Sequence, residues 1–177
     1  SLKGEEFFFE NAKVLEIGSG GGFPSIPNKI LRNDLKFTLV EATGKKCEFL
    51  NTVVKELGLK GVTVLNARAE ELGKDKKYRE KYDYAIARAV AGMNVLSELC
   101  LPLVRIRGKF VAFKGNAEEE LNAAKSAIKT LGGKVKEVYS FDLPCGAGKR
   151  EIIEVEKVFS TDIKYPRQYA KIKKSPL

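Results

Sequence analysis

Short apolar runs that end at glycine or at polar residues predict buried β-strands along the chain. These runs cover residues 13–17, 36–41, 62–66, 82–87 and 109–113. Between them, apolar residues recur every three or four positions, which predicts α-helices over residues 45–57, 94–101 and 118–131. Strands that alternate with helices in this way are typical of an α/β fold built around a parallel sheet.

The pattern changes after Gly133. Residues 134–142 and 151–158 form two further strand-like segments with no helical stripe between them. We expect them to pair antiparallel at one edge of the sheet. The tail over residues 161–177 is basic and holds two prolines, so we expect it to be irregular.

The composition is that of one soluble domain. The chain has 177 residues, of which 44% are hydrophobic, and no apolar run approaches the roughly 20 residues that a membrane span needs. Acidic residues stand near the N-terminus where a signal peptide would carry bases, so we expect a cytoplasmic protein without membrane contact.

Cysteine and histidine usage removes several classes of site. Cys47, Cys100 and Cys145 are far apart and form no C-x-x-C motif, so we expect structural thiols, with neither a metal site nor a disulfide framework. The chain has no histidine. Catalytic triads with histidine, histidine metal sites and the commonest general base are therefore excluded.

The net charge favours a polyanionic partner. The chain carries 32 basic and 23 acidic residues, a formal charge of +9. Lysine and arginine side chains that neutralise phosphates release counterions, which drives binding to nucleic acid. A lysine-rich soluble surface is the alternative, and charge alone does not decide between them.

A glycine-rich loop follows the first strand. Residues 16–24 read Glu-Ile-Gly-Ser-Gly-Gly-Gly-Phe-Pro, and glycines let the backbone approach a ligand where side chains would collide. A dinucleotide fingerprint needs a further glycine at position 23, and this chain has Phe23 and then Pro24. The loop therefore favours a ligand without a pyrophosphate over NAD or FAD. A turn that binds nothing is the alternative.

Three more loops follow strands at the same predicted edge. Glu41 ends the second strand, where a carboxylate can accept hydrogen bonds from both ribose hydroxyls. After the third strand, residues 66–70 offer a backbone amide and an acid that could read an adenine edge. Arg88 follows the fourth strand and favours a carboxylate or phosphate partner, with a surface ion pair as the alternative.

With these four loops in order, the sequence resembles the bacterial 16S ribosomal RNA guanine-N7 methyltransferases, the glucose-inhibited division protein B family. The main motifs are IGSGGGFPSIP at 17–27, VEATGKK at 40–46, ARAE at 67–70 and YDYAIARAVA at 82–91. LPL at 101–103, FKG at 113–115, KREI at 149–152 and YPR at 165–167 also fit. The resemblance therefore runs from about Lys13 to the C-terminus.

The resemblance implies a Rossmann-like class I methyltransferase that uses S-adenosylmethionine (SAM). Its sheet would be mostly parallel and seven-stranded, with an antiparallel C-terminal edge pair and helices on both faces. Cofactor contacts would fall on Gly18, Gly20, Phe23, Glu41, Ala42, Thr43, Ala69, Glu70 and Arg88. The domain would cover residues 13–160, with a short extension over 1–12 and the basic tail over 161–177 packed on it.

The implied reaction transfers a methyl group to N7 of one guanine in 16S rRNA, either free or in a 30S subunit precursor. Guanine N7 already carries an in-plane lone pair, so the reaction needs no strong general base. We expect catalysis by positioning, in which Arg88 and Lys114 are the candidates for any direct role. Candidate RNA contacts are Lys114, Lys149, Arg150 and Arg167, in an enzyme expected to be a monomer.

Rival interpretations remain at this point. An NAD-dependent oxidoreductase is disfavoured by Phe23 and by the absence of histidine. A non-catalytic RNA-binding module would need neither the glycine loop nor Glu41. A class I methyltransferase that acts on another RNA, a protein or a small molecule is opposed only by the resemblance and the net charge.

Overall fold

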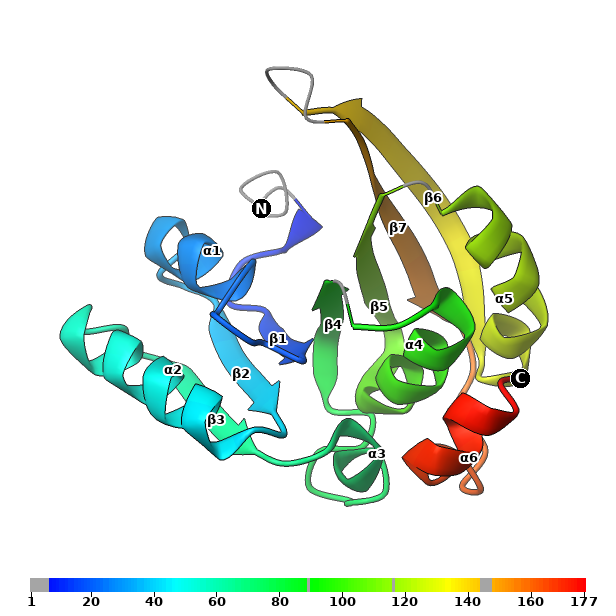
Figure 1. The fold of residues 1–177 in the computed structure, drawn as a ribbon, viewed down its shortest axis with the longest axis horizontal. Helices are drawn as coiled ribbons and strands as arrows, with labels where there is room; N and C mark the ends of the chain where they lie inside the picture. Colours follow the sequence, from blue (N-terminus) through cyan, green and yellow to red (C-terminus); the bar gives the residue numbers. More distant parts are fainter. Residues whose placement is uncertain (1–6, 89, 116, 144–147) are drawn as a thin grey trace.

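The computed structural model describes residues 7–88, 90–115, 117–143 and 148–177. Its centre is one sheet with the strand order β3-β2-β1-β4-β5-β7-β6 (Figure 1). The strands are β1 (Lys13–Ile17), β2 (Lys36–Glu41), β3 (Val62–Asn66), β4 (Tyr82–Arg88), β5 (Val104–Lys114), β6 (Gly133–Asp142) and β7 (Lys149–Lys157). The first five are parallel, and β7 pairs antiparallel with both β5 and β6. The expected seven-stranded sheet with an antiparallel edge pair is confirmed.

Helices cover both faces of the sheet, as expected. They are α1 (Ser25–Leu31), α2 (Gly44–Glu56), α3 (Ala69–Leu72), α4 (Met93–Cys100), α5 (Glu118–Thr130) and α6 (Tyr169–Lys174). Apolar residues of α1 and α2 pack with one sheet face, and those of α3 to α6 pack with the other. The strand order reverses between β1 and β4, and ligands of such folds bind beyond the carboxyl ends of the strands at this point.

Helix α1 has no counterpart among the predicted elements. Pro24 stands immediately before it, and Pro27 stands in its first turn. Proline is tolerated in the first turn of a helix because the amides there have no partner within the helix. The glycine loop is therefore followed directly by a short helix.

Strand β5 is longer than predicted, since it begins at Val104 and runs through Gly108. A Cβ atom at Gly108 would lie 2.7 Å from the carbonyl oxygen of Asp83 on β4, so only glycine fits there. Gly108, which suggested the start of the strand, lies inside it, at a point where β5 and β4 approach each other closely. The register with β4 is interrupted at this level, between Tyr82 and Tyr84.

The tail that was predicted to be irregular contains α6. It packs against the same face of the sheet as α3, α4 and α5. Ile172 on α6 is fully buried. Arg79 donates hydrogen bonds to the carbonyl oxygens of Thr161 (2.6 Å) and Tyr165 (2.7 Å). These bonds tie the tail to the segment between α3 and β4.

Cys47 and Cys100 are both buried free thiols, and burial raises the pKa of each. Cys145 lies outside the described residues. Within the described ranges, no helix combines the length and the apolar character that crossing a membrane requires.

Candidate cofactor site

The glycine loop turns back onto β2. The amides of Gly18 and Ser19 donate to the carbonyl oxygen of Val40, at 2.9 and 3.2 Å. Gly18 has a φ of +66°, and a Cβ atom there would lie 2.7 Å from a methyl group of Val90. Backbone conformation and close contact both require glycine at this position.

Glu41 joins the glycine loop to the end of β2. Its carboxylate accepts hydrogen bonds from the amides of Gly20 (3.1 Å) and Thr43 (2.9 Å). Burial alone would raise the pKa of Glu41, but the amides of Thr43 and Gly20 outweigh it and lower the pKa. The group is an anion whose two oxygens keep further acceptor capacity for ribose hydroxyls.

The loop after β3 is hydrogen-bonded to the end of β2. The amide of Ala67 and the side-chain amide of Asn66 both donate to the carbonyl oxygen of Glu41, at 3.2 and 3.0 Å. This contact places the start of α3, with Ala69 and Glu70, beside the end of β2. Ala42 and Thr43 are exposed on the rim between these loops.

Arg88 ends β4, which flanks β1 on the side opposite to β2. Its guanidinium carbon lies 5.7 Å from the centre of the Phe23 ring, a cation–π contact. Phe23 is 48% exposed, so its ring lies at the surface above the glycine loop rather than in the core. The structure thus brings the expected cofactor residues of four loops to one edge of the sheet.

Glu16 is a functional candidate that the sequence analysis did not single out. It is 1% exposed, and neither carboxylate oxygen has a hydrogen-bond partner among the described residues. Burial raises its pKa to about 7, and the nearby hydroxyl and amide of Ser25, followed by the positive charge of Arg88, offset part of this effect. A buried carboxylate without a partner costs stability, which is typical of a group that serves a ligand. An acid inside the apolar run 13–17 was the signal for it.

Comparison with solved structures shows the fold. A SAM-dependent methyltransferase from Aquifex aeolicus superposes with a TM-score of 0.64 at 18% identity, over 87% of each chain. The TYW2 protein of M. jannaschii, solved in complex with AdoMet, gives a TM-score of 0.67 at 15% identity, over 89% of this chain and 76% of that one. Both confirm the class I methyltransferase fold.

Sequence comparison decides the family. The model of the GidB family, described as rRNA small subunit methyltransferase G, matches residues 1–153. The chain belongs to this family. The ribosomal RNA small subunit methyltransferase G of Lactobacillus delbrueckii subsp. bulgaricus is 49% identical over 97% of this chain and 72% of its own length. That of Staphylococcus epidermidis is 51% identical over 93% of this chain and 69% of its own.

Membership of the rRNA small subunit methyltransferase G family confirms the resemblance noted in the motifs. It also removes the oxidoreductase interpretation, because the family is defined by methyl transfer. The departure at Phe23 and Pro24 from a dinucleotide fingerprint is consistent with this outcome.

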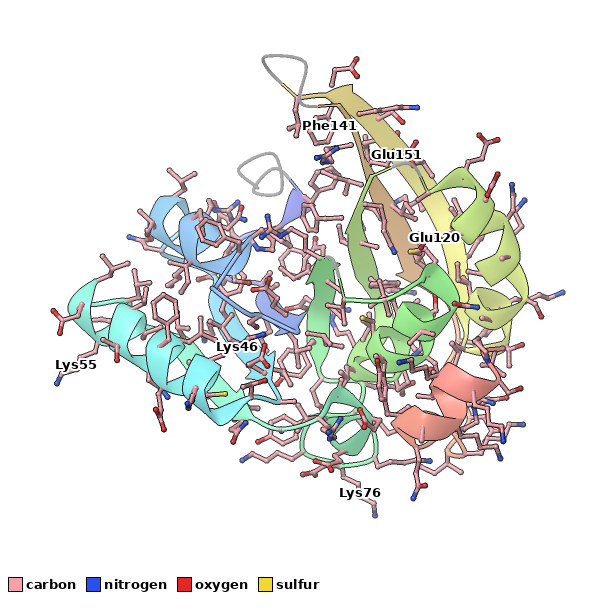
Figure 2. All side chains as sticks on the ribbon, viewed as in Figure 1. Lys46, Lys55, Lys76, Glu120, Phe141 and Glu151 are labelled. Carbon is pink, nitrogen blue, oxygen red and sulfur yellow. The ribbon has the colours of Figure 1, made fainter. Side chains whose placement is uncertain are left out.

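The four basic residues expected to contact RNA do not form one group. Lys114 is mostly buried, and its ammonium donates to the carbonyl oxygen of Ala91 (2.7 Å) and to Glu120 (2.6 Å). Figure 2 labels Glu120 at the start of α5. Because Glu120 also accepts from the amide of Met93, Lys114 holds the loop between β4 and α4. We therefore leave Lys114 out of the proposed RNA contacts.

Arg167 lies away from the cofactor cleft. Its guanidinium donates to both carboxylate oxygens of Glu98 on α4, the shortest distance being 2.6 Å, and Glu98 is fully buried. These bonds raise the pKa of Arg167. The side chain fastens the tail to α4, and we leave it out of the RNA contacts as well.

Lys149 and Arg150 are exposed at the start of β7, at the carboxyl end of β5. The ammonium of Lys149 lies 3.4 Å from Glu151, and Arg150 donates to the carbonyl oxygen of Lys149 at 2.7 Å. Both cations face solvent on the side of the sheet that carries the cofactor cleft. They remain the proposed RNA contacts.

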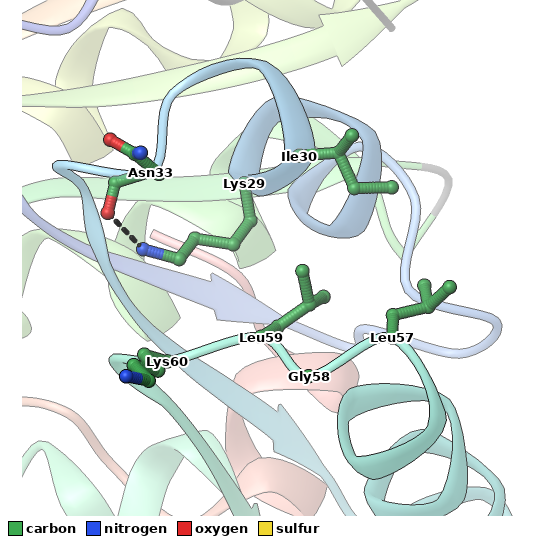
Figure 3. A pocket seen from close by; sticks show the side chains of 7 residues that line it. All are labelled: Lys29, Ile30, Asn33, Leu57, Gly58, Leu59 and Lys60. Carbon is green, nitrogen blue, oxygen red and sulfur yellow. Dashed lines mark hydrogen bonds between the residues drawn. The ribbon is translucent and has the colours of Figure 1, made fainter.

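A cavity of about 710 Å³ lies between the ends of α1 and α2, far from these residues (Figure 3). Lys29 lines it and donates to the carbonyl oxygens of Asn33 (2.5 Å) and Leu35 (2.7 Å) at the start of β2. Its place at the amino edge of the sheet separates it from the glycine loop, which lies at the carboxyl edge.

Proposed function

We propose that this protein transfers a methyl group from SAM to N7 of a guanine in 16S rRNA, as free RNA or within a 30S subunit precursor. Family membership supports rRNA of the small subunit as the substrate class. The observation that carries the proposal is the anionic Glu41, whose carboxylate accepts a hydrogen bond from the amide of Gly20 in the glycine loop.

The cleft residues fit the chemical parts of SAM. Glu41 would accept from the ribose hydroxyls, and the backbone at Gly18 and Gly20 leaves room for the rest of the nucleoside. Glu16, once ionised, would pair with the ammonium of the methionine part. Ala69 and Glu70 would border the adenine, with Phe23, Ala42, Thr43 and Arg88 around the rim. When bound, SAM supplies an electrophilic methyl group on a positively charged sulfur.

The protein's own part in the reaction is positioning. Guanine N7 attacks with a lone pair that is already free, so no residue has to remove a proton first. The protein needs to hold the nucleophile about 3–3.5 Å from the methyl carbon and in line with the bond that breaks. Arg88, at the end of β4, would orient the substrate between the cofactor residues and the proposed RNA contacts Lys149 and Arg150.

One experiment tests the reaction directly. The protein is incubated with unmodified small-subunit RNA and methyl-labelled SAM, and the labelled nucleotide is identified after digestion. We expect label on N7 of a single guanine. Large-subunit RNA serves as the control substrate and should remain unlabelled. Label on another base, or equal labelling of both RNAs, would overturn the proposal.

Cofactor binding separates the enzyme from a decayed RNA-binding module. Isothermal titration should show SAM binding with a stoichiometry of one per chain. The proposed active form is a monomer, with residues 13–160 as the methyltransferase domain, an extension over 1–12 and the tail over 161–177 packed on the domain. Sedimentation at micromolar concentration tests the monomer.

A further inference from the structure

A second cavity, of about 580 Å³, opens at the carboxyl end of β5 and the start of β7. Its walls include Arg88, Phe113, Phe141, Leu143, Arg150 and Ile152. Figure 2 labels Phe141 and Glu151 at this end of β6 and β7. None of the cofactor contacts proposed above except Arg88 lines it.

Strands β5, β6 and β7 contribute two aromatic side chains to the wall of this cavity. Phe113 stands opposite Ile152, and Phe141 stands opposite Arg150, in the registers of β7 with β5 and with β6. Directly paired residues of antiparallel strands share a face, and Arg150 and Ile152 are two positions apart. Two aromatic rings, one aliphatic side chain and one guanidinium therefore line the same side of the sheet.

The rim of the cavity carries net positive charge. The carboxylate of Glu151 already has partners within the protein: it accepts hydrogen bonds from the amide of Ala117 (2.8 Å) and the hydroxyl of Ser140 (3.3 Å), and it lies near Lys149. It therefore does not neutralise Arg150. Arg150 bonds to a neutral backbone carbonyl. An apolar floor with a cationic rim suits a nucleobase, whose ring stacks while its sugar-phosphate backbone is anionic.

Arg88 is the link between this cavity and the cofactor cleft. It lines the cavity, and its guanidinium also packs over the Phe23 ring above the glycine loop. Its charge acts on Glu16 at the end of β1. A base held in the cavity would therefore present an edge toward the cleft, which is the placement that in-line transfer requires.

We propose that this cavity receives the target guanine after the base has left the RNA stack, an inference that rests on the function proposed above. Phe113 and Phe141 form the stacking surface, and Arg150 contacts the phosphate beside the extruded base. Arg88 donates to guanine O6, which neighbours N7 on the same edge. N7 keeps its lone pair, which forms the new bond to the methyl carbon. The electrons of the old methyl–sulfur bond stay on sulfur, and no proton moves.

The chain contains no tryptophan, so a Phe141→Trp variant carries one indole in the cavity. Small-subunit RNA that lacks the methyl group is titrated into this variant in the presence of S-adenosylhomocysteine, the demethylated cofactor product. We expect a stacked guanine to quench the indole fluorescence. The matched control is Phe159→Trp, because Phe159 is 72% exposed and follows the opposite end of β7. Its fluorescence should not respond.

Heparin serves as a polyanion without bases and should leave the fluorescence of Phe141→Trp unchanged. Quenching by heparin equal to that by RNA would show charge-driven binding alone and overturn the stacking proposal. Absence of quenching by RNA, under conditions in which RNA binding is measured independently, would overturn it too.

Activity gives a second readout. Phe141→Ala should lower kcat/KM for RNA by about 5- to 100-fold, since stacking on one aromatic ring has this effect on base binding. Its SAM affinity should match that of the wild type, and Phe141→Tyr should restore most of the activity. Full activity of Phe141→Ala would refute the inference while wild-type transfer to N7 upholds the proposed function. Absence of wild-type transfer would instead refute that function.

Discussion

The carboxylate of Glu41 accepts a hydrogen bond from the amide of Gly20 at a distance of 3.1 Å. The glycine loop and the strand-end acid, 21 residues apart in sequence, are therefore parts of one structure before any cofactor is bound. The amide donors of Thr43 and Gly20 keep this acid ionised despite its burial, and they fix its position. A preformed anion at this position reduces the entropy that cofactor binding would otherwise cost.

Replacing Glu41 with glutamine should weaken SAM binding by about 10- to 100-fold, because hydrogen bonds to a charged group contribute roughly 1.5–3 kcal/mol. The glutamine also cannot accept from Gly20 and Thr43 with both of its terminal atoms. Isothermal titration measures the change. Glu48→Gln, on the exposed side of α2, is the control and should bind SAM as the wild type does. Equal affinity of the two variants would contradict the role given to Glu41.

Replacing Gly18 with alanine should lower the melting temperature by about 2–8 °C. The left-handed φ of +66° costs an alanine about 1–2 kcal/mol, and its methyl group would overlap Val90. A change of 1 kcal/mol shifts the melting temperature of a domain of this size by roughly 2–4 °C. Gly21→Ala in the same loop is the control, since its nearest neighbour would be 3.9 Å away. A larger shift for Gly21→Ala would refute this account of the loop.

The affinity for SAM should rise with pH around neutrality because of Glu16. Burial raises its pKa to about 7, so below that value the side chain is neutral and cannot pair with an ammonium group. Between pH 6 and pH 8 the dissociation constant of the wild type should fall, and that of Glu16→Gln should stay nearly constant. A pH-independent affinity in the wild type would show that Glu16 does not contact the cofactor.

The raised pKa of Glu16 also affects stability. The carboxyl group ionises near 4.5 in the unfolded chain and near 7 in the folded chain. Its contribution to the free energy of unfolding therefore decreases as pH rises through that window.

Sequence patterns placed the candidate cofactor residues at one edge of the sheet because these residues occupy fixed places at strand ends. Glu41 and Arg88 each follow an apolar run, and parallel strands bring their carboxyl ends to one edge. Helix α1 was not predicted; Pro27 stands in its first turn, where proline is tolerated. Glu16 was quoted within the glycine loop, but its lack of a partner is a property of the folded chain.

The roles of single cations could not be predicted in the same way. Lys114 and Arg167 have the charge and loop position of RNA contacts, and the sequence shows nothing that distinguishes them from Arg150. Their partners, Glu120 and Glu98, are set by the packing of α4 and α5 against the sheet. A carboxylate on a neighbouring helix determines whether a basic side chain serves the fold or a ligand.

Arg150 and Arg167 should therefore respond in opposite ways to alanine substitution. Arg150→Ala should reduce the slope of log affinity for RNA against log salt concentration by about one, with little change in stability. Arg167→Ala should leave the slope unchanged and destabilise the protein by about 3–5 kcal/mol, because the buried carboxylate of Glu98 loses its cationic partner and keeps only the backbone amide of residue 167. Salt titrations and urea unfolding of both variants measure these effects. A reduced slope for Arg167→Ala would return that residue to the RNA interface.

Lys157 should make the stability of the protein depend on alkaline pH. Its ammonium is fully buried and donates to the carbonyl oxygen of Leu101 and the hydroxyl of Thr161, both at 2.6 Å. Burial lowers its pKa to about 8 from 10.5, although Glu80, 3.2 Å away, offsets part of the effect. Between these values the unfolded chain binds a proton that the folded chain does not bind. The contribution of Lys157 to the free energy of unfolding therefore increases as pH rises from about 8 to 10.5.

The comparison that isolates this effect is with Lys157→Met, which keeps the length of the side chain but cannot titrate. Relative to this variant, the wild type should gain on the order of 2 kcal/mol of stability across the window. Tyrosines and the other lysines titrate in both proteins, so their contributions cancel in the difference. Urea unfolding at pH 7, 8.5 and 10 measures it. A difference that stays constant with pH would mean that Lys157 keeps its proton in the folded protein, with Glu80 fully compensating for its burial.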